Sequence, residues 1–256
     1  MFKAIWAARW YVLLGLFTFL LILVATTPLH FVWRFAEPAM GRLPVKIEQL
    51  SGTLWNGQLR LQVPALRSAG VIEGQWQLSP LSLLSASPQA HLSLSGEGIR
   101  FDGDARLAAD QTLTLSNTSA YLDADVLEPL LKRNRVGIKG NFELNAVSGW
   151  FNLADRGFGD VAGQLLYSGG DVSFLVDRKT VNATMPMVAG SIEMAGDKAQ
   201  VNIATMEGTQ LIQAYAQQDG WGGVSIRRRF LDVLGQQWPA KADEDTVIFE
   251  VSHKIL

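Results

Sequence analysis

The side chains able to perform acid–base or metal chemistry are few and scattered along this chain. Its histidines are His30, His91 and His253, which lie in unrelated sequence contexts and lack the spacing of paired metal ligands. The chain has no cysteine, which excludes thiolate zinc sites, iron–sulfur clusters, thiol nucleophiles and disulfides. It also has no Gly-x-Ser-x-Gly elbow and no phosphate-binding loop. We therefore predict a protein that is not an enzyme, with no catalytic residues, no cofactor and no metal site.

Charged residues gather in a few short groups, each of which has a structural explanation. We interpret Asp102-Gly103-Asp104 as a turn and Asp125 as the cap of a helix over 125–132. The acidic run 243–245 is predicted to be an exposed loop before the last strand. The basic run Arg227–Arg229 is either a solvated or ion-paired patch or a docking site for an acidic partner.

Tryptophan is abundant, with eight copies in 256 residues. In a β-protein, tryptophan commonly covers glycine on a sheet and fills the core, which is our prediction here. An apolar groove that holds a lipid tail or a partner peptide is the alternative. The tryptophans that follow the first 33 residues are Trp55, Trp76, Trp150, Trp221 and Trp238.

Composition limits the kinds of partner. The formal net charge is −2, from 22 basic and 24 acidic residues, and the isoelectric point is about 5.9. Binding to a phosphate backbone requires a basic surface, so we predict no nucleic-acid partner. Charged residues make up 18% and apolar residues 48% of the chain, and much of the apolar excess lies near the N-terminus.

The first 28 residues have the pattern of a membrane anchor. Residues 10–28 carry no charge and are long enough to cross a bilayer core of about 30 Å as a helix. Lys3 and Arg9 precede this span, so the positive-inside rule places residues 1–9 in the cytoplasm and 29–256 on the other side of the membrane. The alternative is a cleaved signal peptide, but the exit from Val24 to Leu29 lacks an Ala-x-Ala cleavage pattern.

After the anchor, apolar and polar residues alternate with a period of two. One such run sets Leu59, Leu61 and Val63 against Arg60 and Gln62, and glycine-containing turns separate it from the next. Short helices are predicted at 79–84, 125–132 and 227–237. In the first of these, Ser79 is expected to cap the helix and Pro80 to occupy its first position. The fold class is therefore mainly β: a single transmembrane helix followed by one extended, curved antiparallel sheet with a few short helices. The sheet must curl or fold back to bury its apolar face.

The end of the chain continues this alternation almost without error. We predict that 246–256 forms a strand that closes or edges the sheet. On this interpretation Val247, Phe249, Val251 and Ile255 lie on the buried side.

Two sequence segments carry a resemblance to a known family. The first is Leu50-Ser51-Gly52-Thr53-Leu54-Trp55-Asn56-Gly57, and the second is Trp76-Gln77-Leu78-Ser79-Pro80-Leu81-Ser82-Leu83-Leu84. Together with the anchor and the chain length, they resemble the N protein of bacterial type II secretion systems, the GspN family. The signature residues Gly52, Thr53, Leu54, Trp55, Gly57, Trp76 and Pro80 look structural. We expect Gly52 and Gly57 to bracket a strand, so that Trp55 packs across bare backbone.

The resemblance implies a single-pass inner-membrane accessory component of the secretion system that helps to export folded proteins from the periplasm. Its implied partners are other secretion components, namely the inner-membrane platform, the secretin or the pseudopilus. Lipid is a further partner to consider. The β-rich plan is also similar to AsmA-like proteins, so a lipid-binding or lipid-transfer protein of the envelope is the alternative. An apolar groove open to solvent would favour the lipid carrier, and a sheet closed over its apolar side chains would favour the secretion scaffold.

Overall fold

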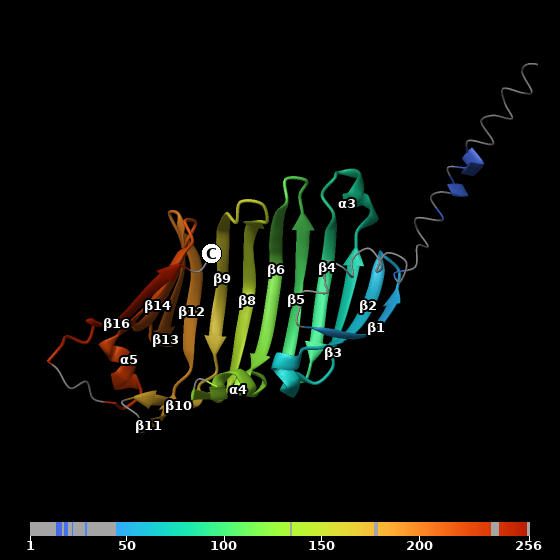
Figure 1. Ribbon diagram of the computed structural model, residues 1–256. Helices are drawn as coiled ribbons and strands as arrows, with labels where there is room; N and C mark the ends of the chain where they lie inside the picture. Colours follow the sequence, from blue (N-terminus) through green and yellow to red (C-terminus); the bar gives the residue numbers. More distant parts are fainter. Residues whose placement is uncertain are drawn as a thin grey trace, which may run out of the picture.

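A broad sheet dominates the molecule, and its strands run side by side in almost the order of the chain (Figure 1). The computed structural model describes residues 14–16, 18–19, 22, 29, 45–133, 135–176, 179–236 and 241–254. The large sheet has 13 strands, in the spatial order β1 (Lys46–Gly52), β2 (Asn56–Gln62), β3 (Ile72–Leu78), β4 (Gln89–Gly96), β5 (Ile99–Leu107), β6 (Thr112–Asp123), β8 (Asn141–Asn152), β9 (Phe158–Tyr167), β12 (Val188–Ala195), β13 (Lys198–Thr205), β14 (Gln210–Gln217), β15 (Trp221–Arg227) and β16 (Val247–Lys254).

The remaining elements are short and lie at one end of the large sheet's strands, except α3 at the other end (Figure 1). A small sheet has the order β11 (Lys179–Met185), β10 (Gly170–Val176) and β7 (Gly137–Ile138). The helices are η1 (Pro64–Ala69), α3 (Pro80–Leu84), α4 (Ala124–Arg133) and α5 (Arg228–Val233). Neighbouring strands are antiparallel in both sheets, which confirms the prediction of a mainly β fold built on one extended antiparallel sheet.

The predicted anchor is barely covered by the structure. Of the span at 10–28, only residues 14–16, 18–19 and 22 are described, and the predicted cytoplasmic segment 1–9 lies outside the described residues. Among the described residues, no helix is both long enough and apolar enough to cross a membrane. The transmembrane helix therefore stays a prediction.

The large sheet has one apolar and one polar face. Side chains of successive residues point to opposite faces, and cross-strand partners share a face, so the register assigns each residue to a side. One row on the polar face crosses all the strands, with a bulge between β6 and β8. Its members are Ser51, Gln58, Gln75, Ser93, Asp102, Ser119, Asn145, Gln164, Ser191, Asn202, Gln213, Ser225 and Glu250.

Bulges interrupt the pairing in the middle of the sheet. The register shifts between Asp102 and Asp104 of β5, and again along β6 and β8. Asn117 and Ala146 take positive φ values of 51° there. A bulge adds a residue to one strand and bends it. The prediction that Asp102-Gly103-Asp104 forms a turn is therefore wrong, because these residues lie inside β5.

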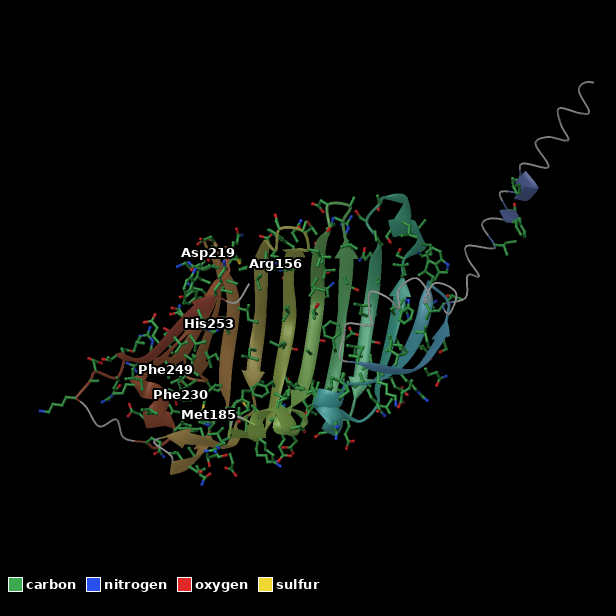
Figure 2. All side chains as sticks on the ribbon, viewed as in Figure 1. Arg156, Met185, Asp219, Phe230, Phe249 and His253 are labelled. Atoms are coloured by element: carbon green, nitrogen blue, oxygen red, sulfur yellow. The ribbon has the colours of Figure 1, made fainter. Side chains whose placement is uncertain are left out.

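Most of the buried apolar side chains form two separate clusters. One joins Ala69 of η1, Ile72 of β3 and Val126 of α4. The other contains Tyr167, Met185, Val188, Leu211 and Leu234, with Phe230 of α5 packed against it. Met185 and Phe230 lie together near the end of the sheet where α5 and β11 are found (Figure 2). Much of the apolar face lies outside both clusters and stays half-buried, so within the described residues the sheet does not bury this face completely by curling or folding back.

The last strand is at the predicted place but has the wrong burial. β16 pairs with β15 at the edge of the sheet, which confirms that the C-terminal run is an edging strand. However, Val247, Phe249 and Val251 are 43%, 53% and 43% exposed. Alternation identifies the apolar side of a strand, whereas burial requires a second layer, and the described residues provide none at this edge. Ile255 lies outside the described residues.

The predicted short helices are present with small corrections. Helix α5 ends at Val233, before the predicted end at residue 237. In α4, Asp125 follows the first residue, and its backbone N–H donates to Asp123 Oδ1 at 2.9 Å, so Asp123 caps the helix in its place. Asp125 instead accepts a hydrogen bond from Lys139 Nζ at 2.6 Å.

Candidate functional site

The signature segment forms the β1–β2 hairpin. Gly52 ends β1 and pairs with Gly57 of β2, so the two glycines bracket a turn. The prediction that they bracket a strand is wrong. The Thr53 N–H donates to the Asn56 carbonyl at 2.9 Å, and the Asn56 N–H donates to Thr53 Oγ1 at 3.2 Å. Gly52 has a φ of +94°, and a Cβ there would lie 2.3 Å from the Asn56 carbonyl oxygen. The tight turn therefore requires glycine at position 52.

The tryptophan that covers glycine in this motif is Trp76. Trp76 and Gly57 are direct cross-strand partners, and a Cβ on Gly57 would lie 1.9 Å from Trp76 Cζ2. The Trp76 indole N–H donates to the Leu54 carbonyl at 3.0 Å, which fixes the ring over the hairpin. The aromatic side chain nearest to Gly57 is therefore Trp76, and the packing expected of Trp55 stays a prediction. Trp150 covers Gly159 in the same way, which confirms the general prediction that tryptophan covers glycine on this sheet.

The second signature segment is tied to the first by the backbone. The Leu78 N–H donates to the Trp55 carbonyl at 2.7 Å, just before Pro80 begins α3. Pro80 is at the start of this helix as predicted, but the Ser79 side chain makes no capping hydrogen bond. The Ser82 side chain instead links α3 to β4, since its Oγ donates to the Ser79 carbonyl at 2.6 Å and accepts from the Gln89 N–H at 2.9 Å. The signature thus connects four elements, β1, β2, β3 and α3.

The apolar face carries a continuous row of apolar residues and glycine across the whole sheet. At the usual strand spacing of about 4.8 Å, a row of this kind extends for about 55–60 Å along the sheet. Its members, each the registered partner of the next, are Leu50, Leu59, Gly74, Leu94, Phe101, Ala120, Leu144, Leu165, Gly190, Ile203, Ile212, Ile226 and Phe249.

A second row runs beside the first and belongs to neither buried cluster. It consists of Gly57, Trp76, Leu92, Gly103, Thr118, Val147, Gly163, Ile192, Val201, Ala214, Val224 and Val251. Its polar groups are the Trp76 indole and the Thr118 hydroxyl, which donate to the Leu54 and Ser116 carbonyls. The two rows therefore offer almost no free hydrogen-bonding group, and acyl chains or apolar side chains fit such a surface best.

Sequence reasoning missed one polar cluster, which lies on the opposite face. His91 Nδ1 lies 2.9 Å from Asp104 Oδ1, and its Nε2 lies 3.1 Å from Asp102 Oδ2. The hydrogen bond to Asp104 raises the pKa of His91, with smaller electrostatic contributions from both carboxylates. The pKa of Asp104 is lowered, first by His91 and then by Asn117 Nδ2 at 3.2 Å. The signal in the sequence that could have revealed this cluster is the spacing of two between Asp102 and Asp104, since residues two apart in a strand lie on the same face.

This cluster has no metal geometry. Within the described part of the chain, no group of three histidine or carboxylate side chains is placed to hold a metal ion. His30 lies outside the described residues, and His253 is exposed on the edge strand β16.

A hollow of about 860 Å³ lies on the polar face across β9, β12, β13 and β14. Polar side chains that line it hydrogen-bond to one another: Gln210 Nε2 donates to Asn202 Oδ1 at 3.3 Å, and the Arg227 guanidinium donates to Gln210 Oε1 at 3.1 Å. The residues that line it include no nucleophile paired with a base. The arrangement stiffens the sheet, since neighbouring strands are joined by their side chains.

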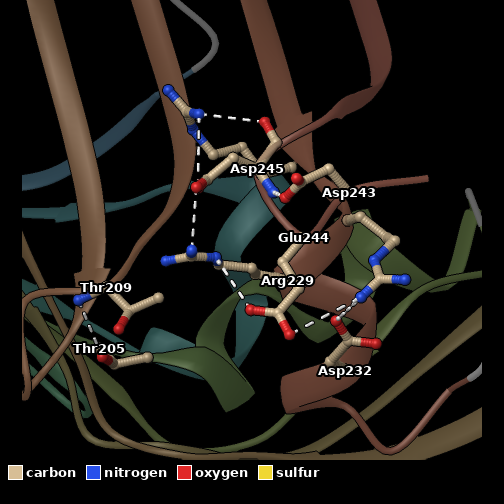
Figure 3. Close-up of polar contacts among 9 residues, drawn as sticks. Thr205, Thr209, Arg229, Asp232, Asp243, Glu244 and Asp245 are labelled. Carbon is tan, nitrogen blue, oxygen red and sulfur yellow. Dashed lines mark hydrogen bonds and ion pairs between the residues drawn. The ribbon is translucent and has the colours of Figure 1, made fainter.

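The basic run Arg227–Arg229 is paired within the chain (Figure 3). Arg229 lies 2.9 Å from Asp245 and 3.7 Å from Glu244, and Arg228 lies 3.4 Å from Asp232. The ion-paired interpretation of this patch is therefore confirmed, and the run 243–245 is its partner and not a merely exposed loop. These pairs hold the loop before β16 against α5.

Comparison with known proteins identifies the family. A family model described as "Type II secretion system (T2SS), protein N" matches residues 44–229, a stretch that includes the signature hairpin and most of the large sheet. No curated protein and no solved structure matches the chain. Since the family model covers well over half of the sequence, the chain belongs to the protein N family of the type II secretion system.

Proposed function

We propose that this protein is a non-enzymatic accessory component of the type II secretion system that contributes to the export of folded proteins from the periplasm. In this proposal, residues 10–28 anchor the chain in the inner membrane and 29–256 lie in the periplasm. Family membership carries the proposal. The large half-buried apolar face supports it, because an exposed surface of this kind is typical of a protein that binds partners.

The partners proposed are other secretion components: the inner-membrane platform, the secretin or the pseudopilus. The second apolar row is the surface that we assign to this contact, because it lies outside both buried clusters. A matched pair of variants tests it. Val201 lies in this row on β13, and Asn202, the next residue, points to the polar face. Val201→Asp and Asn202→Asp each add one negative charge to the same strand, on opposite faces.

The experiment is complementation of a deletion strain, read by the fraction of a folded exoprotein that reaches the medium. We expect deletion to leave the exoprotein in the periplasm, and wild type and Asn202→Asp to restore its export. Val201→Asp should restore little, provided that the purified variant melts like the wild type. Normal export from the deletion strain would refute the proposed role.

The topology has a test of its own. A reporter that is active only in the periplasm, fused after Leu256, should be active, and the mature chain should keep Met1. A soluble form that starts near residue 27 would show cleavage instead of anchoring.

One observation favours a second candidate, the binding of lipid. Both apolar rows are continuous across the sheet, and the second row is not covered by either buried cluster. Acyl chains need an apolar surface without hydrogen-bonding groups, which these rows provide. Extraction of the purified full-length protein and analysis of the extract should then yield phospholipid, and Val201→Asp should yield less than Asn202→Asp. Lipid retention without any export defect on deletion would favour lipid handling over the secretion role.

A further inference from the structure

The two edges of the large sheet differ in how they are protected. At one edge, β1 has a bulge between Ile47 and Gln49 and ends at Gly52. At the other edge, β16 is eight residues long, contains neither proline nor glycine, and has no register shift after its first residues. Natural proteins blunt edge strands with bulges, prolines or very short length, because a regular free edge pairs with other strands. Within the described residues, β16 has one neighbour, β15, so its outer edge is free to pair.

The apolar face reaches this edge and remains exposed there. Phe249 and Val251 are 53% and 43% exposed, and they end the two apolar rows. On the adjacent strand β15, Val224, the partner of Val251, is 40% exposed. Figure 2 shows Phe249 and His253 on the outermost strand. An added strand would satisfy the backbone edge and extend both rows at once.

We propose that β16 pairs in antiparallel fashion with β16 of a second copy of this chain, about a two-fold axis at Ser252. The axis is perpendicular to the sheet, so the apolar faces of both copies lie on the same side. The charges on the polar face select this register. Glu250 and Lys254, both exposed, face Lys254 and Glu250 of the second copy and form two ion pairs.

Other registers between the two β16 strands pair their side chains less favourably. If the axis passed through Glu250, the two carboxylates would face each other directly, which is unfavourable. A register displaced by one residue would place the apolar side chains of one copy opposite the polar side chains of the other. With the axis at Ser252, Val251 faces His253 of the second copy, so the faces that carry the apolar rows lie on the same side of the contact.

The chain contains no cysteine, so one introduced cysteine reports on this contact alone. Directly opposed residues of an antiparallel pair have Cα atoms about 4.5–5.5 Å apart, within the range that a disulfide spans. In the purified full-length protein, mild oxidation of Ser252→Cys should give a covalent dimer. Ser191→Cys is the matched control, because Ser191 is also exposed on the polar face but lies on β12, well inside the sheet. We expect at least about tenfold less cross-linking at position 191.

The charge pairs give an independent measurement by light scattering over a range of concentration. Glu250→Lys turns two attractions into two repulsions and should weaken dimerisation about tenfold, whereas Glu250→Lys combined with Lys254→Glu should restore it. A monomer at all concentrations, equal cross-linking at 191 and 252, or no effect of Glu250→Lys would each overturn the proposal. Open-ended assemblies cross-linked between β1 and β16 would also overturn it.

Discussion

The contact between Gly57 and Trp76 gives the sharpest test of how the signature works. A methyl group at position 57 would occupy the space of the indole, since its carbon would lie 1.9 Å from Trp76 Cζ2. In Gly57→Ala the ring must therefore move away and lose its hydrogen bond to the Leu54 carbonyl. The lost bond costs about 1 kcal/mol and the forced repacking about 1–3 kcal/mol. We expect a loss of about 2–4 kcal/mol in the free energy of unfolding.

A double-mutant cycle separates this effect from a general intolerance of alanine at position 57. Trp76→Ala alone should cost about 3 kcal/mol, at the low end for tryptophan truncation because the ring is half-buried. In the Trp76→Ala background no ring opposes the new methyl group, so Gly57→Ala should cost less than about 0.5 kcal/mol, giving a coupling of about 1.5–4 kcal/mol. Urea unfolding followed by far-ultraviolet circular dichroism measures all four variants. Additive costs within about 0.5 kcal/mol would refute the proposed contact.

Three further results are expected. Gly52→Ala should lower the free energy of unfolding by about 1–3 kcal/mol, because position 52 combines a positive φ with a backbone clash; an unchanged urea midpoint would contradict this. NMR titration should show the pKa of His91 above that of a free histidine and lowered by Asp104→Asn. Since the pKa of His91 is higher in the folded than in the unfolded state, the stabilisation from His91 is complete below the unfolded-state pKa of about 6.5 and is lost as the pH rises through the folded-state pKa. A His91 pKa equal to that of a free histidine would contradict this. Phe249→Ala should cost less than about 1.5 kcal/mol, whereas Ile72→Ala should cost about 2–5 kcal/mol, because Phe249 is 53% and Ile72 5% exposed; equal thermal shifts would show that Phe249 is covered.

Local patterns in the sequence determined the class of fold and the place of most of the predicted turns. Alternation with a period of two follows from strand geometry alone, so runs such as Leu59–Val63 indicate strands whatever lies beside them. Turns such as 195–197 and 219–220 require residues that tolerate unusual backbone angles, and the structure has turns at both places. The residues of the signature segment Gly52–Gly57 pointed to the family that the family model then matched, although the conformation of this segment could not be predicted.

The tertiary structure decided which side chains meet and which are covered. Asp102-Gly103-Asp104 has the composition of a turn, but pairing with β4 and β6 draws it into a bulged strand and brings both carboxylates to His91. Position 57 meets Trp76 because the register between β2 and β3 places them opposite each other. Phe249 has the pattern of a buried residue and is exposed, because no element covers the edge where it lies. Alternation is a property of one strand, whereas register and coverage depend on bulges and on distant segments, which a local pattern does not encode.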